Sequence, residues 1–296
     1  MPARPPEPTI ASLRDAPGDG TGDGDTLALY WTFYWAVAEA QFARWLPRRP
    51  SRVLDVSGGQ GHSATQATAA GHSVIEVLDP GLGQSGKGGE AGKGGGPGRI
   101  RGAGKARQAG GVRAAGRIRE AGGGRPAGHA ARVIADSGSL TFLNDQCVDA
   151  VVAENRVLSR HLVTESTVAE IARVLRPGGR VLLSVDSLTL GMALLAEQNC
   201  WAHLSDVPSA EVVLVPWPDG TITRCFWADQ LRELLTEVGL EVEWIRPRTV
   251  LSPSTVEHVL KTSPQAMPRL VRTELNAPPG DESLGIHLLA SARRTP

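Results

Sequence analysis

Short apolar runs alternate with segments of helical pattern along most of the chain. Seven runs have the composition of strands and lie at residues 53–56, 72–78, 132–136, 148–153, 180–184, 240–245 and 284–293. Segments of helical pattern lie at 62–70, 170–176, 188–201 and 228–238, and a short helix is predicted after Pro253 with Ser252 or Ser254 near its cap. Alternation of this kind is typical of an α/β protein with a mostly parallel sheet.

Two breaks in the pattern predict how the chain turns. The helix that includes residue 170 is expected to end at Pro177-Gly178-Gly179, because proline cannot continue a helix and the glycines allow a reversal into the next strand. Residues 211–226 contain two β-type runs around Pro218-Asp219-Gly220. That segment predicts a hairpin.

A helix over residues 25–46 is predicted from an aromatic stripe. Asp25 and Thr26 can cap its start, and Pro47 follows its end. The segment holds seven of the 13 aromatic residues of the chain. Two interpretations stay open: the stripe packs on the domain, or it forms a lid over a ligand pocket, in which case Trp31 and Trp35 contact the substrate.

The richest chemical signal is residues 53–62, Val-Leu-Asp-Val-Ser-Gly-Gly-Gln-Gly-His. An apolar strand ends at Asp55, a glycine-rich turn follows, and a helix begins at about His62. Gly58, Gly59 and Gly61 let the backbone adopt positive φ and approach a ligand closely. The next strand also ends in an acid, Asp79. A βαβ unit with an acid after each strand predicts a cofactor that contains adenosine.

Two cofactor classes fit this unit. Gly59-x-Gly61-x-x-Ala64 also satisfies the dinucleotide fingerprint. However, Asp55 closes the strand and the turn is longer than in that pattern. The arrangement resembles motif I of the class I S-adenosylmethionine-dependent methyltransferases, usually written D-x-G-x-G-x-G. Asp55, Gly59 and Gly61 match it, and Ser57 replaces its first glycine.

Further segments extend the resemblance to about residues 50–80 and 130–250. They include a third strand that ends at Asp136, the residues that lead into 148–153, and the Pro177-Gly178-Gly179 break. The resemblance implies a Rossmann-like, doubly wound, seven-stranded, mostly parallel sheet with an antiparallel C-terminal strand. It also implies S-adenosylmethionine as the cofactor.

The family's binding residues carry over onto matching positions. By resemblance, Asp55 and the turn of Ser57, Gly58, Gly59 and Gly61 would hold the methionine part. Asp79 would accept hydrogen bonds from the ribose hydroxyls, a geometry that suits the two oxygens of a carboxylate. Asp136 would receive the adenine amino group, with Ser137 beside it.

Two residues are candidates for a general base. His161 follows the strand at 148–153, and a neutral imidazole there could deprotonate a hydroxyl; a positioning role is the alternative. Glu154 is its rival. The Ala-Glu-Asn-Arg sequence at 153–156 lacks the Asn/Asp-Pro-Pro-aromatic motif of adenine and cytosine amino-methylases, which argues against DNA base methylation.

Residues 187–226 are predicted to build the acceptor side, as insertions at this point do in relatives. Met192, Trp201 and Trp217 are candidate acceptor contacts, with His203 and Arg224 as further candidates. The three cysteines form no CxxC pair and show no metal-ligand spacing, so no metal site is predicted.

Composition places these segments in one domain, residues 25–296, after a disordered leader at 1–24. No apolar run reaches the roughly 18–20 residues that span a bilayer. The leader lacks the apolar core of a signal peptide. A cytoplasmic protein without a membrane partner is therefore expected.

The neutral net charge hides a basic segment. Residues 81–130 carry ten Lys or Arg, two acids and 19 glycines, so the insert at 81–129 cannot bury enough apolar surface to order itself. Three interpretations stay open: a flexible loop with at most a helix near 112–120, a stretch of sequence read out of frame, or an arm that binds nucleic acid. The segment has no aromatic residue for stacking on bases, which disfavours the last.

The resemblance implies methyl transfer from S-adenosylmethionine to a small-molecule acceptor at O, N or C, in secondary or cofactor metabolism. A catalytically inactive cofactor-binding relative is one alternative, and Ser57 and the basic insert motivate it. An RNA methyltransferase that uses the insert is the other. The oligomeric state and the acceptor are left open.

Overall fold

The computed structural model describes residues 27–58, 62–82, 128–217, 220–277 and 285–296. Its centre is a single sheet to which nine strands of the described segments belong. They are β1 (Arg52–Asp55), β2 (Ser73–Leu78), β3 (Ala130–Ile134), β4 (Val148–Ala153), β5 (Leu175–Ser187), β6 (Val213–Pro216), β7 (Ile222–Phe226), β8 (Leu240–Pro247) and β9 (His287–Arg294).

Seven of these strands form the predicted sheet. β3, β2, β1, β4 and β5 lie side by side and run parallel. β9 pairs antiparallel with β5 on one side and with β8 on the other. The prediction of a mostly parallel sheet with an antiparallel C-terminal strand is therefore confirmed. The β6–β7 hairpin is an addition, and it joins the sheet where β7 pairs with the last residues of β5.

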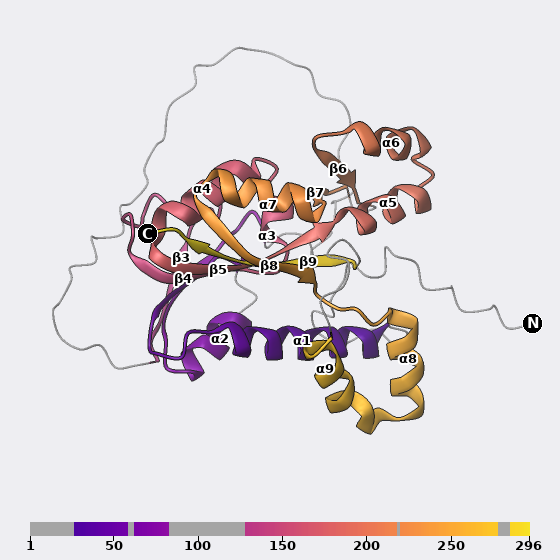
Figure 1. Ribbon diagram of the computed structural model, residues 1–296, viewed down its shortest axis with the longest axis horizontal. Helices are drawn as coiled ribbons and strands as arrows, with labels where there is room; N and C mark the ends of the chain where they lie inside the picture. Colours follow the sequence, from indigo (N-terminus) through magenta and orange to yellow (C-terminus); the bar gives the residue numbers. More distant parts are fainter. Residues whose placement is uncertain (1–26, 59–61, 83–127, 218–219, 278–284) are drawn as a thin grey trace, which may run out of the picture.

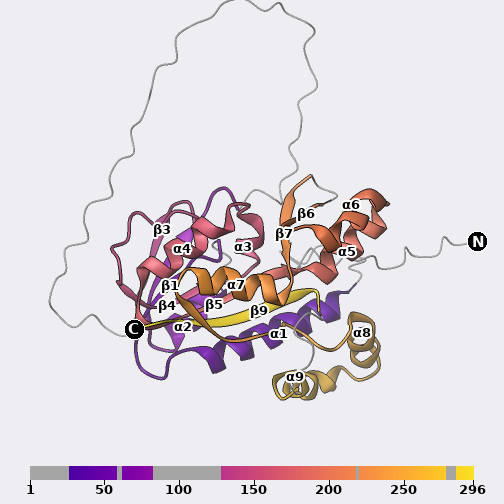
Figure 2. The same cartoon turned by 45° about the horizontal axis from the view of Figure 1, so that its top comes forward.

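Helices cover both faces of the sheet (Figure 1). One face carries α1 (Ala28–Trp45) and α2 (His62–Ala69), with α8 (Pro253–Thr262) and α9 (Met267–Leu275) packed against α1. The other face carries α3 (Val157–Arg160), α4 (Thr164–Val174) and α7 (Ala228–Glu237). α5 (Leu188–Glu197), α6 (Trp201–Asp206) and β6 lie together at one end of the sheet, as Figure 2 shows from a second direction. Because β3, β2, β1, β4 and β5 run parallel, their carboxyl ends lie at the same edge of the sheet.

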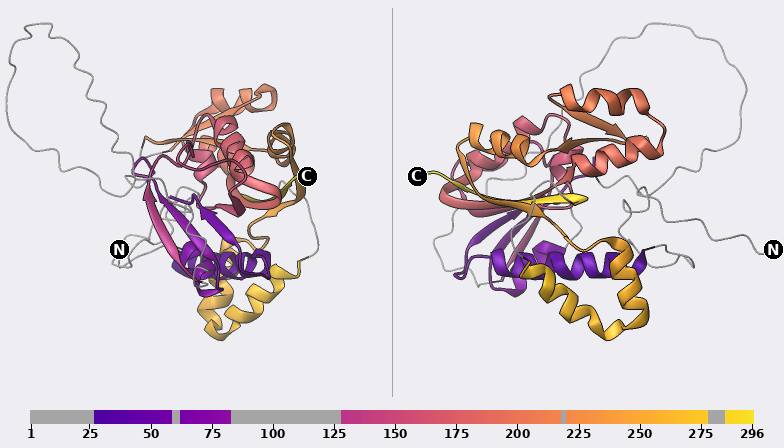
Figure 3. Two further views of the ribbon diagram at one scale, coloured as in Figure 1. Left: turned by 90° about the vertical axis from the view of Figure 1, so that its left-hand side faces the viewer. Right: turned by 45° about the vertical axis from the view of Figure 1, so that its right-hand side comes forward.

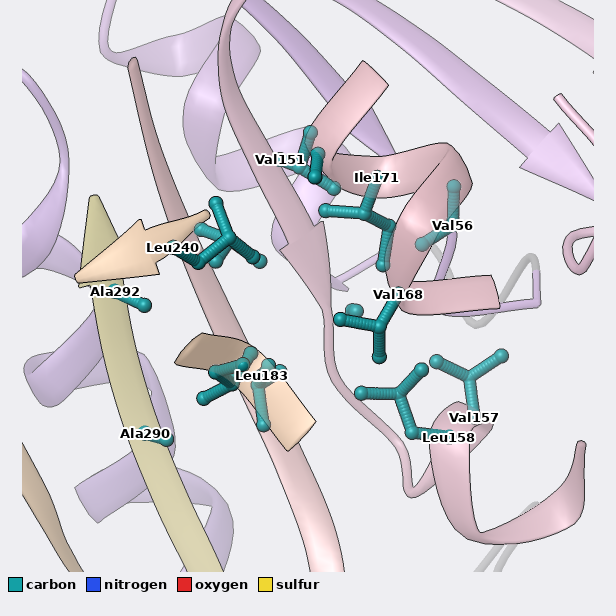
Figure 4. Close-up of a cluster of buried hydrophobic side chains, with 14 of the residues drawn as sticks. Val56, Val151, Val157, Leu158, Val168, Ile171, Leu183, Leu240, Ala290 and Ala292 are labelled. Carbon is teal, nitrogen blue, oxygen red and sulfur yellow. The ribbon is translucent and has the colours of Figure 1, made fainter. Parts of the chain in front are cut away.

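The main core lies between the sheet and the helices α3, α4 and α7. Figure 4 shows α4 directing Val168 and Ile171 toward Val151 of β4 and Leu183 of β5. All four side chains are buried, and burial of a side chain of this size contributes about 1.5–3 kcal/mol. This packing holds β4 and β5 rigidly, and both strands lead into the candidate site.

α1 packs along its length against two different partners. Its first half joins Val256 and Leu260 of α8 in one cluster, and its second half, with Phe42 and Trp45, packs on β1, β5 and β9. The right-hand view in Figure 3 shows α1 beneath the sheet, with α8 and α9 on the side of α1 that faces away from the sheet. The aromatic stripe is therefore buried against the domain. The predicted caps Asp25 and Thr26 lie outside the described residues, and Leu27 is at the N-cap position.

Two predicted helix ends need correction. α4 ends at Val174, and β5 begins at Leu175, before the Pro177-Gly178-Gly179 break. Proline disfavours the helical region for the residue that precedes it, so the chain is already extended at Arg176. The single helix expected over 188–201 is two helices. Asn199 adopts a left-handed conformation with φ of 57°, which ends α5 and separates it from α6.

The other expected turns agree with the structure. Residues 213–226 form the predicted antiparallel hairpin, although Pro218 and Asp219 of its turn lie outside the described residues. Ser252 is the N-cap of α8 and accepts a hydrogen bond from the backbone N–H of Thr255.

The edge strand β3 is exposed. Ile134 at its end is 75% exposed, and none of the five residues of β3 is buried. The basic insert precedes β3, and its residues 83–127 lie outside the described part of the chain, as does the helix considered near 112–120. None of the helices in the described segments is both long and apolar enough to cross a membrane.

Candidate active site

The turn after β1 is organised by Asp55. Its buried carboxylate accepts a hydrogen bond from the Ser57 N–H at 2.9 Å and another from the Ser63 hydroxyl at the start of α2. Burial raises the pKa of Asp55, and the hydrogen bonds from Ser63 and Ser57 oppose that rise. Asp55 therefore ties the end of β1 to α2 and shapes the loop between them.

Gly58 is the described glycine of that turn, because Gly59 and Gly61 lie outside the described residues. Its φ is +82°, a conformation that side chains disfavour. A Cβ atom here would also lie 3.3 Å from the Leu82 side chain, which follows β2. Glycine thus lets the two chain segments approach closely at the strand ends.

Asp79 is held in its charged form at the end of β2. Its Oδ1 accepts a hydrogen bond from the Gly81 N–H at 2.8 Å, and its Oδ2 accepts from the N–H and the hydroxyl of Ser137 at 2.8 and 2.6 Å. Burial alone would raise the pKa of Asp79, but the hydrogen bonds from Ser137 and Gly81 outweigh it and leave the pKa below its ordinary value.

His161 completes a hydrogen-bonded chain with these two residues. Its Nε2 lies 2.7 Å from the Ser137 hydroxyl and 3.8 Å from Asp79 Oδ2. Because the single hydroxyl proton of Ser137 goes to Asp79, Nε2 of His161 carries the hydrogen and Nδ1 is the free base. Burial lowers the pKa of His161, so the ring is mostly neutral at neutral pH.

A first cleft surrounds this chain at the ends of β2 and β3. It is lined by Asp79, Pro80, Gly81, Leu82, Asp136, Arg160 and His161. Asp136 is exposed there, and its Oδ1 accepts a hydrogen bond from the Gly138 N–H. Ligand atoms of Asp79, Asp136 and His161 lie within 4.8 Å of one another, a spacing that a metal ion could use. Hydrogen bonds within the protein already hold these side chains in place, since Ser137 contacts both Asp79 and His161, and the Gly138 N–H donates to Asp136.

A second cleft lies beyond the ends of β4 and β5. Its walls come from α1, the loop after β4, the strands β5 and β9, and Arg248, which follows β8. Its lining residues are Trp31, Tyr34, Trp35, Glu154, Asn155, Arg156, Ser184, Arg248 and His287. We call it the aromatic cleft, because three rings of α1 form one wall.

Two ion pairs lie at the aromatic cleft. Arg156 binds Asp186, which is fully buried at the end of β5. Arg248 lies 3.0 Å from Glu154, and it also donates to the Gln41 side chain of α1 at 3.0 Å. The opposite charge of Glu154 helps to keep Arg248 protonated although it is buried, and its pKa stays above its ordinary value.

His287 faces the cleft from the start of β9. Its Nδ1 lies 2.9 Å from the Tyr34 hydroxyl, and its Nε2 lies 3.5 Å from Asp186. Burial, with Arg156 and Arg248 nearby, lowers the pKa of His287 well below its ordinary value. The ring is therefore neutral at neutral pH.

Ser57 links the turn after β1 to the aromatic cleft. Its hydroxyl accepts a hydrogen bond from the backbone N–H of Glu154 at 3.0 Å. The turn after β1 and the loop after β4 are thus joined directly. Glu154 lines the aromatic cleft, whereas Ser57 belongs to the turn that leads toward α2.

The structure separates the predicted acceptor residues into two groups. Trp31, Trp35 and Glu154 line the aromatic cleft together. Trp217 is buried behind it, with the Arg156 guanidinium 4.8 Å from its ring centre. Met192 packs in the cluster around α5, and Trp201 is 57% exposed, so neither lines the cleft.

The remaining candidates also lie outside this cleft. His203 is exposed on α6, and Arg224 pairs with Glu165 at 2.6 Å. His161 lies at the first cleft, beside the residues predicted for ribose and adenine.

Sequence reasoning missed Arg248 and His287 as site residues, and it treated Tyr34 and Arg156 only as parts of longer segments. The only signal in the sequence was that Arg248 and His287 are polar residues beside apolar strand runs, which is equally typical of structural positions. Their contacts join segments more than 200 residues apart, such as Gln41 with Arg248 and Tyr34 with His287.

Comparison with solved structures identifies the fold. A putative S-adenosylmethionine-dependent methyltransferase from Listeria monocytogenes superposes with a TM-score of 0.50 at 10% identity, over 88% of this chain and 100% of the other. A methyltransferase from Methanosarcina mazei gives 0.47 at 16% identity, over 86% and 97% of the chains. The 1,6-didemethyltoxoflavin-N1-methyltransferase of Burkholderia thailandensis, with S-adenosylhomocysteine bound, gives 0.46 at 18% identity, over 100% and 94%.

No family model matches the sequence, and no curated protein does. At these low identities the structural likeness establishes the fold alone. The chain has the fold of the class I S-adenosylmethionine-dependent methyltransferases.

Proposed function

We propose that the protein transfers a methyl group from S-adenosylmethionine to a small-molecule acceptor. The hydrogen bond between Ser57 and Glu154 carries this proposal, because it joins the glycine turn to the aromatic cleft. Methyl transfer needs the cofactor and the acceptor side by side, with water excluded from the reacting atoms. A cofactor cleft and an acceptor cleft at the carboxyl edge of one α/β sheet would meet that need.

The described residues fit the cofactor in three respects. Gly58 has a positive φ and lets the turn approach Leu82, which lines the first cleft. Asp79 is charged, as a ribose-binding carboxylate must be. Asp136 is exposed in the same cleft and can accept a hydrogen bond from an amino group. Together with Asp55, Ser57 and Ser137, and with Gly59 and Gly61 outside the described residues, these would hold the cofactor.

S-adenosylmethionine, when bound, supplies an activated methyl group. The chain's own residues align the acceptor, exclude water and take up its proton if the acceptor atom carries one. Glu154 is the better placed of the two predicted bases, because it lines the aromatic cleft. His161 would instead position Asp79 through Ser137. The acceptor itself would lie against Trp31 and Trp35.

One observation favours the alternative of a cofactor-binding relative without turnover. Asp79 already accepts three hydrogen bonds from Gly81 and Ser137. Ribose hydroxyls would have to share Oδ1 or displace the Ser137 hydroxyl. The RNA methyltransferase alternative depends on residues 81–129, most of which lie outside the described part of the chain.

The proposed domain organisation follows from these assignments. Residues 25–296 form the methyltransferase domain after a leader at 1–24. The acceptor side expected at residues 187–226 stays a prediction, because none of its described residues lines the aromatic cleft. Methyl transfer at O, N or C, a cytoplasmic location and a role in secondary metabolism remain predictions.

Calorimetric titration with S-adenosylhomocysteine tests the proposal. Saturable 1:1 binding is expected, with at least a tenfold loss in Asp79→Ala, since one charge-assisted hydrogen bond is worth about 1.5–3 kcal/mol. Glu237→Ala is the matched control, because it removes an exposed carboxylate of α7 far from the clefts and should bind normally. If the folded wild-type protein does not bind the compound, the proposal is wrong.

Turnover separates the two functional alternatives. Methyl transfer to a panel of small acceptors that exceeds cofactor hydrolysis supports the enzyme. Tight binding of S-adenosylhomocysteine without any transfer supports the inactive relative.

A further inference from the structure

The carboxylate of Asp79 has little room left for a ligand hydroxyl. An ionised carboxylate has about four acceptor positions. Three are taken in the protein, by the N–H of Gly81 at Oδ1 and by the N–H and the hydroxyl of Ser137 at Oδ2. Asp79 lines the first cleft, so a ligand in that cleft lies beside this carboxylate. One position is therefore open to it without a change in the protein.

A ribose on Asp79 would use two positions. Its 2′ and 3′ hydroxyls are neighbours, and each can donate one hydrogen bond. The first cleft has a volume of about 480 Å³, within the roughly 300–1,000 Å³ typical of ligand pockets, so it has room for a nucleoside. Binding of both ribose hydroxyls thus requires that Asp79 release one of its three contacts within the protein.

The Ser137 hydroxyl is the contact that can be released. The other two donors are backbone N–H groups, whose positions are set by the turns after β2 and β3. A serine hydroxyl, in contrast, can rotate toward another partner. The backbone N–H of Ser137 stays on Asp79 Oδ2 at 2.8 Å when the side chain turns, so the carboxylate keeps its place.

His161 offers the released hydroxyl a second partner. Its Nε2 lies 2.7 Å from Ser137 Oγ. While Ser137 donates to Asp79, Nε2 carries the ring hydrogen and donates to the serine oxygen. For Ser137 to donate to Nε2 instead, the ring hydrogen must leave Nε2 and another must join Nδ1, with no net change in the number of protons.

The surroundings of His161 allow both tautomers. Burial lowers the pKa of His161 and keeps the ring neutral at neutral pH. Nδ1 and the Oδ1 of Asp136 both lie beside Gly138, at 3.0 and 3.2 Å from the position that a Cβ atom would take there. A hydrogen on Nδ1 would therefore lie near an acidic side chain, which can accept it.

We infer that Ser137 is a positioning residue whose hydroxyl exchanges partners when the cofactor binds. It donates to Asp79 in the free protein and to His161 when a ribose occupies Asp79. This inference rests on the proposed function, because it concerns how the cofactor site of that function takes up its ligand. The hydroxyl competes with the ribose, and the contact with His161 offsets its release.

Calorimetry with S-adenosylhomocysteine tests the competition. Ser137→Ala removes the hydroxyl and keeps the backbone N–H on Asp79, so the compound should bind at least threefold more tightly than to the wild type. Ser139→Ala, in an exposed position of the same turn, is the matched control and should bind like the wild type. A hydroxyl that simply held the cofactor would give weaker binding in Ser137→Ala. Unchanged or weaker binding therefore overturns the inference.

A second pair of variants tests the role of His161. His161→Phe keeps a ring and removes both nitrogen atoms, so the released hydroxyl loses its partner and the affinity should fall roughly three- to tenfold, as for one lost hydrogen bond. When residue 137 is already alanine, the same replacement should leave the affinity unchanged. Equal losses in the two backgrounds would contradict the exchange of partners.

Nitrogen-15 NMR of the histidine rings tests the change of tautomer, because a protonated ring nitrogen and a bare one resonate far apart. At pH 8 the free protein should show Nε2–H at His161, and S-adenosylhomocysteine should change this to Nδ1–H. Comparison with His161→Phe identifies the signal. Nδ1–H in the free protein, or Nε2–H in the complex, overturns the inference. The measurement uses the wild-type chain, so it decides the question even where Ser137→Ala does not fold.

The calorimetric titrations distinguish the two possible failures. If the wild type binds S-adenosylhomocysteine and Ser137→Ala does not bind it more tightly, the exchange of partners is wrong and the proposed function stands. If neither protein binds, the proposed function is wrong and the exchange falls with it. Binding by Ser137→Ala alone would support the competition at Asp79 and contradict methyl transfer by the wild-type chain.

Discussion

Arg156 binds Asp186 through two hydrogen bonds, from Nε to Oδ1 at 2.6 Å and from Nη2 to Oδ2 at 3.1 Å. Asp186 is completely buried near the end of β5, and Arg156 follows β4 in a left-handed conformation with φ of 60°. The pair therefore fixes the loop after β4, which also carries Glu154 and Asn155. Its geometry determines where these side chains face the aromatic cleft.

Removing Arg156 should destabilise the protein strongly. In Arg156→Met the Asp186 carboxylate stays buried without its counter-charge, and loss of one partner of a buried pair costs about 3–5 kcal/mol. Urea unfolding measures this change. Arg176→Met breaks an exposed pair with Asp149 and should cost about 0–1 kcal/mol. Similar costs for the two variants would contradict the view that burial makes the first pair critical.

Stability should fall as the solution becomes acidic, partly because of His287. Its pKa is well below 6.5 in the folded protein, so only the unfolded chain takes up this proton as the pH falls below 6.5. Unfolding is then favoured by about 1.4 kcal/mol for each pH unit, until the folded-state pKa is reached. Above pH 6.5 the residue adds no pH dependence.

Urea unfolding between pH 7.5 and 5 checks this prediction in His287→Gln. The variant should show a shallower decline than the wild type, although His161 and His72 keep part of it because burial lowers their pKa values too. His203→Gln, on the exposed face of α6, should leave the slope unchanged. An unchanged slope in His287→Gln would show that this histidine titrates normally.

Gly58→Ala should weaken cofactor binding more than it weakens folding. Both Gly58 and Gly220 have φ of +82°, so alanine at either position carries a similar backbone strain of about 1–2 kcal/mol. Only at Gly58 does the added carbon meet a neighbour, Leu82 at 3.3 Å, since nothing lies within 4 Å at Gly220.

Comparing Gly58→Ala with Gly220→Ala therefore separates the effect of the turn on ligand binding from the cost of backbone strain. Thermal unfolding should shift in both variants, somewhat more in Gly58→Ala because of the contact with Leu82, while affinity for S-adenosylhomocysteine should fall at least several-fold in Gly58→Ala alone. Unchanged affinity in Gly58→Ala would mean that this turn does not contact the ligand.

Glu257 should prove important for the position of α1. Its carboxylate accepts the backbone N–H of Tyr30 in the first turn of α1 at 2.9 Å. Replacing such a cap typically costs about 0.5–2 kcal/mol. Glu257→Ala should therefore speed amide hydrogen exchange at Tyr30 and Trp31.

The matched variant is Lys261→Ala. It removes the exposed ammonium group that pairs with Glu257 at 3.2 Å and leaves the cap in place, so exchange in α1 should stay near the wild-type rate. Faster exchange in both variants would assign the effect to the ion pair rather than to the cap.

The fold was predictable because local signals agree with the global arrangement. Alternation of strands and helices, the break at Pro177 and the acids at strand ends each depend on neighbouring residues. The end of α4 was placed too late, because the effect of proline on the preceding residue begins before the proline itself.

The first cleft was largely predictable, and the aromatic cleft was not. Asp79, Asp136 and Ser137 follow strands, and parallel strands bring their ends to one edge. The place of Arg248 and His287 in the site depends on their contacts with Gln41, Glu154 and Tyr34, which are remote in sequence. The spacing of apolar residues along the chain does not indicate such long-range contacts. An isolated histidine in an apolar strand is normally interpreted as a core residue.

The aromatic cleft has a consequence for the timing of biosynthesis. One wall comes from α1, which leaves the ribosome early, and the other includes His287 of β9, which is made more than 240 residues later. β9 also inserts between β5 and β8, so the sheet stays incomplete until it arrives. A domain generally folds as a unit, although its N-terminal residues are synthesised first. The nascent chain must therefore keep the apolar face of α1 protected, without an acceptor site, until β9 has been translated and has closed the sheet.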